Sequence, residues 1–157
     1  MKKSGYYIYN NVAIAACAIM SLLNVSPKIP LSKVALLMPI MLDDGISQKM
    51  HYQKYQTFDA VITQNRIYLS NFNDRYVDLL PQVVNGLSLL LDLNLVRLQG
   101  EYVEVIDTEF YQTYIKSCDS KRLCVINEIS AKLLGMIKDT DVAKEYSKLN
   151  IPQIRNL

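Results

Sequence analysis

Hydrophobic positions are concentrated in the first third of the chain. The run Val12 to Leu23 is apolar at almost every position, and a second run, 29–42, is interrupted by two prolines and a lysine. A membrane-spanning helix needs about 20 consecutive apolar residues, so both runs are too short to span. Asn10 or Asn11 can cap a helix that begins at Val12, because a short side-chain carbonyl accepts a free first-turn N–H. The pattern predicts a helix buried on nearly all sides.

The residues before this run do not resemble an export signal. Lys2 and Lys3 precede it, but the polar and aromatic insert SGYYIYNN (4–11) separates their charge from the apolar stretch. A signal peptide also needs a small-x-small cleavage site after its apolar region, and none follows Leu23. We therefore expect neither export nor membrane contact.

Further along, three predicted helices follow one another. Thr57 can cap a helix over FDAVITQ (58–64), and Asn65 can cap a second over RIYLSNFNDRY (66–76). In the third, DLLPQVVNGLSLLLDL (78–93), apolar residues recur at spacings of three and four and form a stripe.

The proline and the glycine of the third helix predict where it begins and where it contacts another helix. Pro81 is expected in its first turn, where a missing N–H does little harm. Gly86 costs about 1 kcal/mol relative to Ala in a helix interior. We therefore expect Gly86 at a close contact between two helices.

After the third helix, LNLVRLQGEYVEVID (93–107) has the β-branched and aromatic content of a hairpin that turns at Gly100. Three short helices followed by a hairpin is a winged-helix order. The predicted fold is α+β and mostly α: one domain over 1–157, with an apolar helical part (1–50), a winged-helix-like part (51–107) and C-terminal helices (108–157).

The last part of the chain predicts two more helices. The first, SKRLCVINEISAKLLGMIK (120–138), has a broad apolar face, and Gly135 is expected to let the chain turn near its end. Asp139 or Thr140 is expected to cap the second, DVAKEYSKLN (141–150).

Cysteine and histidine usage indicates neither a disulfide framework nor a metal site. Cys17 lies in the apolar run, and Cys118 and Cys124 have no second pair. A structural zinc site needs four well-spaced ligands, and His51 is the only histidine. We expect no metal, no cofactor and a reducing, cytoplasmic location.

Motifs for catalysis are missing from the sequence. The five glycines never cluster, so there is no phosphate-binding loop of the Walker or dinucleotide type. The adjacent carboxylates Asp43 and Asp44 follow an apolar run and indicate a helix end, because acid-base chemistry needs a second positioned group. We expect a protein that is not an enzyme.

Charge gives weak support for nucleic-acid binding. The formal net charge is +2, and the third helix carries no Lys or Arg, although a helix in a DNA groove normally brings cations to phosphates. The candidate nucleic-acid contacts are Arg97, Lys121 and Arg122, which are too few for a basic patch.

Aromatic and apolar residues indicate a protein partner instead. Tyrosines concentrate outside the strong helices, and exposed tyrosine is typical of interfaces, although tyrosines covering the protein's own surface are an equal alternative. The candidate partner-interface residues are Tyr7, Tyr9, Leu36 and Met38, because the apolar N-terminal third exceeds what a small monomer exposes.

The order of these features resembles a known family. The features are YNN (9–11) before an apolar helix, LLMPIMLDD (36–44), the helix at Thr57-Phe58, FNDRYVDLLP (72–81), a helix and hairpin, LLGMIK (133–138) and KLNIPQI (148–154). Together they look like the small middle component of three-component ABC systems, which are similar to Lamassu-type anti-phage defence complexes.

The resemblance implies a non-catalytic accessory subunit. Such a subunit binds an SMC- or Rad50-like ATPase and helps to control an effector, often a nuclease, and any DNA contact in the complex is expected to be indirect or non-specific. The alternative from another class is a stand-alone winged-helix transcription regulator that binds DNA. A small enzyme whose site the motifs miss is a third reading.

Overall fold

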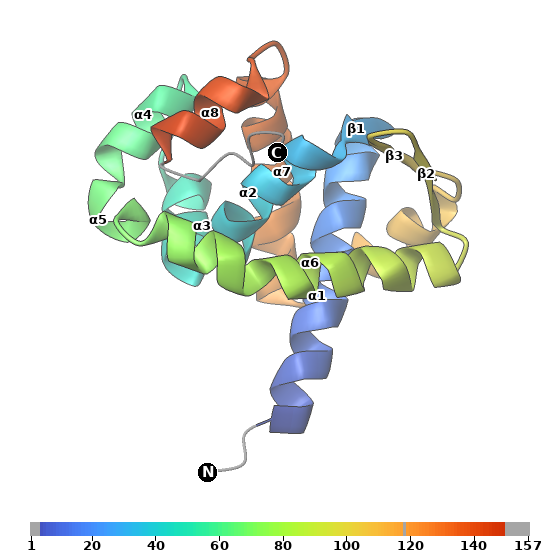
Figure 1. The fold of residues 1–157 in the computed structure, drawn as a ribbon. Coiled ribbons are helices and arrows are strands. Elements are labelled where there is room, and N and C mark those ends of the chain that lie inside the picture. The colour runs from blue at the N-terminus through green and yellow to red at the C-terminus, as the bar shows by residue number, and fades with distance from the viewer. Residues whose placement is uncertain (1–3, 118, 150–157) are drawn as a thin grey trace.

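The computed structural model describes residues 4–117 and 119–149, and of residues 4–11 the backbone alone. Helices surround the long helix α1, with a small sheet at one end (Figure 1). The helices are α1 (Ser4–Val25), α2 (Leu31–Leu42), α3 (Asp44–Tyr52), α4 (Phe58–Gln64), α5 (Arg66–Leu69), α6 (Phe72–Asp92), the π-helix η1 (Tyr111–Ile115), α7 (Lys121–Ile137) and α8 (Val142–Lys148). The strands are β1 (Lys28–Pro30), β2 (Val96–Gln99) and β3 (Tyr102–Val105). The predicted α+β, mostly α class is confirmed.

Helix α1 is the centre of the structure. Its residues from Ala15 to Leu23 are buried apart from the half-buried Cys17, because α2, α6 and α7 pack around it. The predicted burial on nearly all sides is confirmed. The predicted start at Val12 is wrong: the helix begins at Ser4, so Asn10 and Asn11 lie inside it rather than capping it. Once the buried part has nucleated the helix, adding a residue that is only mildly unfavourable in a helix costs little.

Helix α6 crosses α1 at Gly86. A Cβ atom built on Gly86 would lie 3.0 Å from the backbone nitrogen of Ala16 and 3.1 Å from the Cβ of Ala15. Only a residue without a side chain allows the two helix backbones to approach this closely. The expected close helix contact at Gly86 is confirmed.

Helix α6 is longer than predicted, and Pro81 lies in its middle rather than in its first turn. The early start at Phe72 follows from burial, since the Phe72 ring is buried in the core. Pro81 is exposed, so water can reach the carbonyl that its missing N–H leaves without a helical partner.

The helices before α6 are confirmed in part. The Thr57 hydroxyl accepts a hydrogen bond from the Ala60 N–H at 3.2 Å, as its predicted cap role requires. The second predicted helix is reduced to the four residues of α5. Asn65 does not cap it with its side chain, which instead donates to the Val61 carbonyl at 2.8 Å.

The predicted hairpin is confirmed, with Gly100 at a φ of +61° in the turn. The sheet also has a third strand that the sequence did not indicate: β1 pairs antiparallel with β3, which gives the order β1-β3-β2. Ile29 lies opposite Val103, and both are buried. This pairing connects the end of α1 directly to the hairpin.

The C-terminal helices follow the predicted apolar pattern with different ends. The predicted apolar face of α7 is buried at all six positions, namely Leu123, Ile126, Ile129, Leu133, Leu134 and Ile137. Gly135 does not end this helix but lies within it, at an ordinary helical φ. The cap of α8 is Asp141 rather than Asp139 or Thr140, and its carboxylate accepts from the Ala143 N–H at 3.0 Å.

The contrast between two helical glycines gives a stability prediction. We expect Gly86→Ala to lower the free energy of unfolding by about 1–3 kcal/mol, because the new methyl group meets the fixed backbone of Ala16. Gly135→Ala should raise that free energy by up to about 1 kcal/mol, since nothing lies within 4 Å of the new Cβ and Ala favours a helix. Urea unfolding followed by circular dichroism measures both free energies. If both substitutions changed the free energy of unfolding by the same amount in the same direction, the close contact between α1 and α6 at Gly86 would be contradicted.

Candidate interaction surface

The two partner-interface residues expected on α2 are not on the surface. Leu36 and Met38 are both 0% exposed. Helix α2 packs against α1, α6 and α7, so its apolar residues from Leu36 to Leu42 are covered by the chain itself. The expectation that this apolar run needs a partner for its burial is therefore wrong.

The other two expected interface residues lie on α1. The side chains of Tyr7 and Tyr9 lie outside the described part of the structure, so their contacts are not assigned. The backbone of this first part of α1 projects past α6, away from the other helices (Figure 1).

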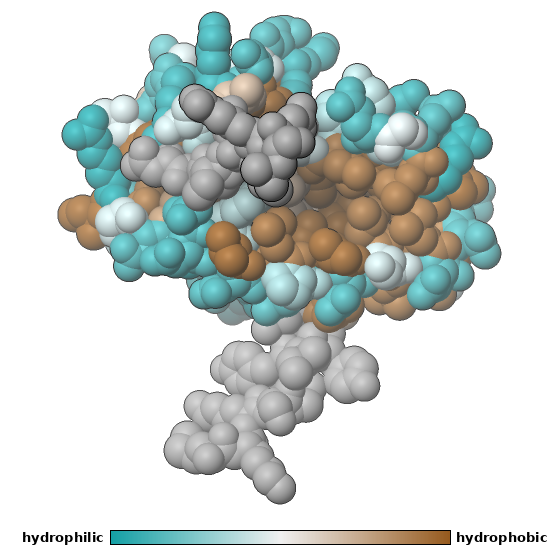
Figure 2. All heavy atoms as spheres, viewed as in Figure 1, coloured by the Kyte–Doolittle hydropathy of each residue, from teal (hydrophilic) through white to brown (hydrophobic). Residues whose placement is uncertain are grey.

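An incompletely covered apolar surface lies on α6 and the hairpin. Val83, Gly86 and Leu90 face the core, whereas the neighbouring stripe of the same helix lies on the flank. We call this surface the α6–hairpin patch; it consists of Val84, Leu87 and Leu91 of α6 and Leu98 of β2. Val84 is 57% exposed and Leu98 47% exposed, and the other two are half-buried. Figure 2 shows apolar atoms gathered over the C-terminal half of α6 and the hairpin.

The charges on α6 are mainly negative. Asp74, Asp78 and Asp92 are exposed, and the helix contains no lysine. Its one arginine, Arg75, forms an ion pair with Asp43, whose other carboxylate oxygen caps α3 by accepting from the Ile46 N–H. Asp43 therefore stands at a helix end, as the sequence predicted.

The three candidate nucleic-acid contacts lie on two separate elements, and two of them are paired. Arg97 on β2 donates to the Glu104 carboxylate opposite it on β3 at 2.9 Å, which raises the pKa of Arg97 and lowers that of Glu104. Arg122 in α7 lies 3.1 Å from the Asp44 carboxylate and donates to the Leu42 carbonyl at 2.9 Å. Lys121 is exposed beside it in the first turn. Phosphates would compete with internal carboxylates for both arginines.

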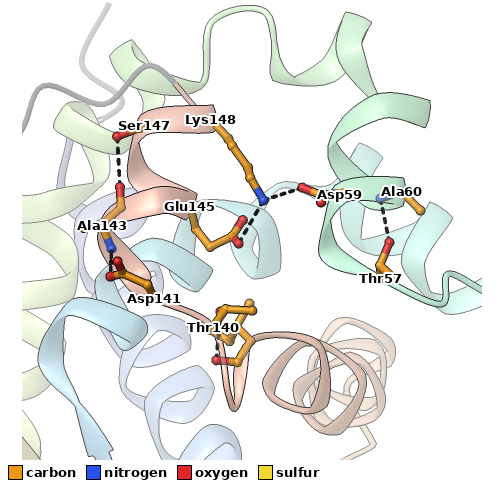
Figure 3. A network of polar contacts seen from close by, with 10 residues as sticks. Thr57, Asp59, Ala60, Thr140, Asp141, Ala143, Glu145, Ser147 and Lys148 are labelled. Atoms are coloured by element: carbon orange, nitrogen blue, oxygen red, sulfur yellow. Dashed lines mark hydrogen bonds and ion pairs between the residues drawn. The ribbon is translucent and has the colours of Figure 1, made fainter.

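A polar network attaches α8 to α4 (Figure 3). The Lys148 ammonium lies between two carboxylates, 2.6 Å from Asp59 and 3.2 Å from Glu145. Glu145 is 3% exposed, so this cation is the partner of a nearly buried carboxylate. The hydrogen bonds to Asp59 and Glu145 raise the pKa of Lys148. Glu145 and Lys148 lie three residues apart in α8, a spacing that is visible in the sequence, whereas the contact with Asp59 joins α8 to α4 and has no such signal.

Tyr146 attaches α8 to α2 and α6. Its hydroxyl donates to the Ser32 carbonyl at 2.7 Å and lies 3.3 Å from the Tyr76 hydroxyl. Burial, and then the contact with Tyr76, raise the pKa of Tyr146 far above its usual value. Both contacts of α8, at Tyr146 and at Lys148, are therefore made by the protonated side chains.

Within the described residues, no cluster of His, Cys, Asp and Glu is suited to hold a metal ion. None of the helices in that same part of the chain is long and apolar enough to cross a membrane.

The raised pKa values predict a loss of stability at alkaline pH. Tyr146 and Lys148 bind their protons more tightly folded than unfolded, so their stabilisation is complete below the ordinary pKa values of 10.0 and 10.5 and decreases above them. We expect Tyr146→Phe to flatten the decline in unfolding free energy between about pH 9 and 11. Urea unfolding at each pH measures it. Tyr114→Phe, at an exposed position, is the control, and its unfolding free energy should decline with pH as in the wild type. An equal decline in the wild type and both variants would contradict the stabilising role of the Tyr146 proton.

No protein-family model matches the chain, and neither a curated protein nor a solved structure matches it significantly.

Proposed function

We propose that this chain is a non-catalytic adaptor subunit that binds a partner protein through the α6–hairpin patch. The observation that carries the proposal is the exposure of two large apolar side chains, Val84 on α6 and Leu98 on β2, on two elements that contact each other. Contiguous apolar surface rimmed by polar residues is typical of protein–protein contacts. The exposed carboxylates of α6 favour a partner with a complementary basic rim.

The identity of the partner rests on the sequence resemblance. LLMPIMLDD (36–44) and FNDRYVDLLP (72–81) are similar to segments of the small middle component of three-component ABC systems. We propose that the partner is an SMC- or Rad50-like ATPase of a cytoplasmic anti-phage defence complex, in which this subunit helps to control an effector such as a nuclease.

The projecting start of α1 is a second proposed contact. Residues 4–11 include Tyr6, Tyr7, Ile8 and Tyr9, and their helix backbone extends beyond the packed helices (Figure 1). A helix end rich in aromatic residues that stands outside the body of a protein is suited to lie in a groove of a partner. Tyr7 and Tyr9 remain candidate interface residues on this basis.

We also propose a winged-helix-like arrangement, over more of the chain than 51–107. The elements α1, β1, α2 and α6 followed by the hairpin occur in that order, with α3, α4 and α5 between α2 and α6, and β1 completes the sheet. In this arrangement α6 takes the place of the DNA-recognition helix. Its exposed Asp74, Asp78 and Asp92 would repel phosphates, which favours a protein partner over the alternative function of a DNA-binding regulator.

A binding experiment tests the adaptor proposal. If a neighbouring gene encodes a coiled-coil ATPase, the chain is co-expressed with it, and we expect the two to purify together. Val84→Asp and Leu98→Asp should each weaken binding at least tenfold, about 1.4 kcal/mol, because a charge would be buried in the contact. Isothermal titration calorimetry measures the affinity.

Ile67→Asp is the matched control. Ile67 is 88% exposed on α5, outside the α6–hairpin patch, so the same change of charge there should leave the affinity within twofold. Circular dichroism checks that all three variants fold. Wild-type binding by Val84→Asp and Leu98→Asp would overturn the proposed surface. A chain that binds no ATPase but shifts a specific DNA fragment would favour the regulator.

A further inference from the structure

A pocket of about 390 Å³, which shares no residue with the α6–hairpin patch, lies between the end of α1, strand β1, the first turn of α2 and the last turns of α7. Its volume falls in the range of roughly 300–1,000 Å³ typical of small-molecule sites. It is lined by Val25, Ser26, Lys28, Ile29, Pro30, Lys33, Ala131, Leu134, Gly135 and Lys138.

The charged residues of this lining all have one sign. Three are lysines, Lys28, Lys33 and Lys138, and among the residues that the structure describes no Asp or Glu lines the pocket. The remaining wall is mainly apolar and includes Val25 and Leu134. A cavity with an apolar wall and unneutralised ammonium groups is complementary to a molecule that has both an apolar body and a negative charge.

Two of the three lysines are held by neutral oxygens. Lys33 donates to the Ile137 carbonyl at 2.9 Å and to the Lys138 carbonyl at 2.8 Å, at the C-terminal end of α7. An ammonium group has three donors, so these two bonds fix its position and leave one donor for a ligand. Lys28 donates to the Gln99 side-chain oxygen at 2.8 Å and lies over the Tyr102 ring.

The carboxylate of Glu104, which lies near Lys28, is hydrogen-bonded to an arginine. Glu104 lies opposite Lys28 in the sheet, and the positive charge of Lys28 contributes to lowering the pKa of Glu104. The Glu104 carboxylate nevertheless accepts its hydrogen bond from Arg97, at 2.9 Å. The arginines of the α7 start and of the hairpin pair with carboxylates, whereas Lys28 and Lys33 meet neutral acceptors. The charge of Lys33, which bonds only to neutral carbonyls among the described residues, is therefore available to an anion, whereas that of Lys28 is shared in part with Glu104.

Gly135 keeps one wall of the pocket open. It lies inside α7, where glycine weakens a helix relative to alanine, and nothing within 4 Å of its position would obstruct a side chain. Packing within the chain therefore does not require a glycine there. A larger side chain at Gly135, a lining residue, would extend into the space that a ligand would occupy.

We propose that this pocket binds a small organic anion, with its carboxylate, phosphate or sulfonate group at Lys33 and Lys138 and its apolar body against Val25, Ile29 and Leu134. The site is separate from the proposed adaptor surface and does not depend on it. A ligand here would contact the end of α1, β1 and α7 together.

A pair of fluorescent probes tests the proposal on the full chain. The anion 8-anilinonaphthalene-1-sulfonate carries a sulfonate on an aromatic body, and N-phenyl-1-naphthylamine has the same rings without the charge. We expect the sulfonate to bind at one site, at least tenfold more tightly than the neutral amine. Equal affinities would overturn the anion site, because the pocket would then select for apolar character alone.

Variants of two lining residues locate the binding. Gly135→Leu fills the pocket and should weaken sulfonate binding at least tenfold. Gly135→Ala is its control, because it replaces the same glycine with a side chain too small to fill the pocket, and it should weaken sulfonate binding less than threefold. Lys138→Gln should weaken it at least threefold, and Lys144→Gln, at an exposed position on α8 outside the pocket, should not. Circular dichroism confirms folding of each variant. Sulfonate binding that is unchanged in Gly135→Leu would place the probe elsewhere and refute the site.

Discussion

The crossing of α6 over α1 at Gly86 is the contact on which the rest of the structure depends. It brings the backbone of α6 against Ala15 and Ala16, at a distance that a single methyl group would disturb. Because α1 also packs against α2 and α7, this contact fixes the position of the helices around it. The chain leaves α1 directly into β1, and β1 pairs with β3. The orientation of the hairpin thus follows from the same central helix.

The crossing also decides which residues of α6 reach the surface. Successive residues of an α-helix are rotated by about 100°, so a helix that directs Gly86 and Leu90 inward places Val84 and Leu91 on its flank. Val84 of this flank and Leu98 of the neighbouring strand β2 both remain exposed. The apolar surface that we propose as a partner contact is therefore a consequence of core packing.

Charge is distributed differently on the two faces considered for binding. Arg75 of α6, Arg97 of the hairpin and Arg122 of α7 each pair with a carboxylate of the same chain, so phosphates would compete with internal partners for all three arginines. Lys28 and Lys33, in contrast, bond to neutral oxygens beside a pocket whose lining, in the described part of the chain, includes no acidic residue. Internal pairing thus disfavours nucleic acid on the first face and favours a small anion on the second.

The sequence by itself determined the features that depend on local periodicity and capping: the mostly helical class, the Thr57 cap, the hairpin at Gly100 and the buried face of α7. Gly86 was predictable as a close contact because glycine is unfavourable inside a helix. Only the tertiary structure decided that Leu36 and Met38 are core residues. An apolar run has the same pattern whether its own chain or a partner covers it. The pairing of β1, the α8 network and the lysine-lined pocket join residues distant in sequence, and periodicity contains no information about such contacts.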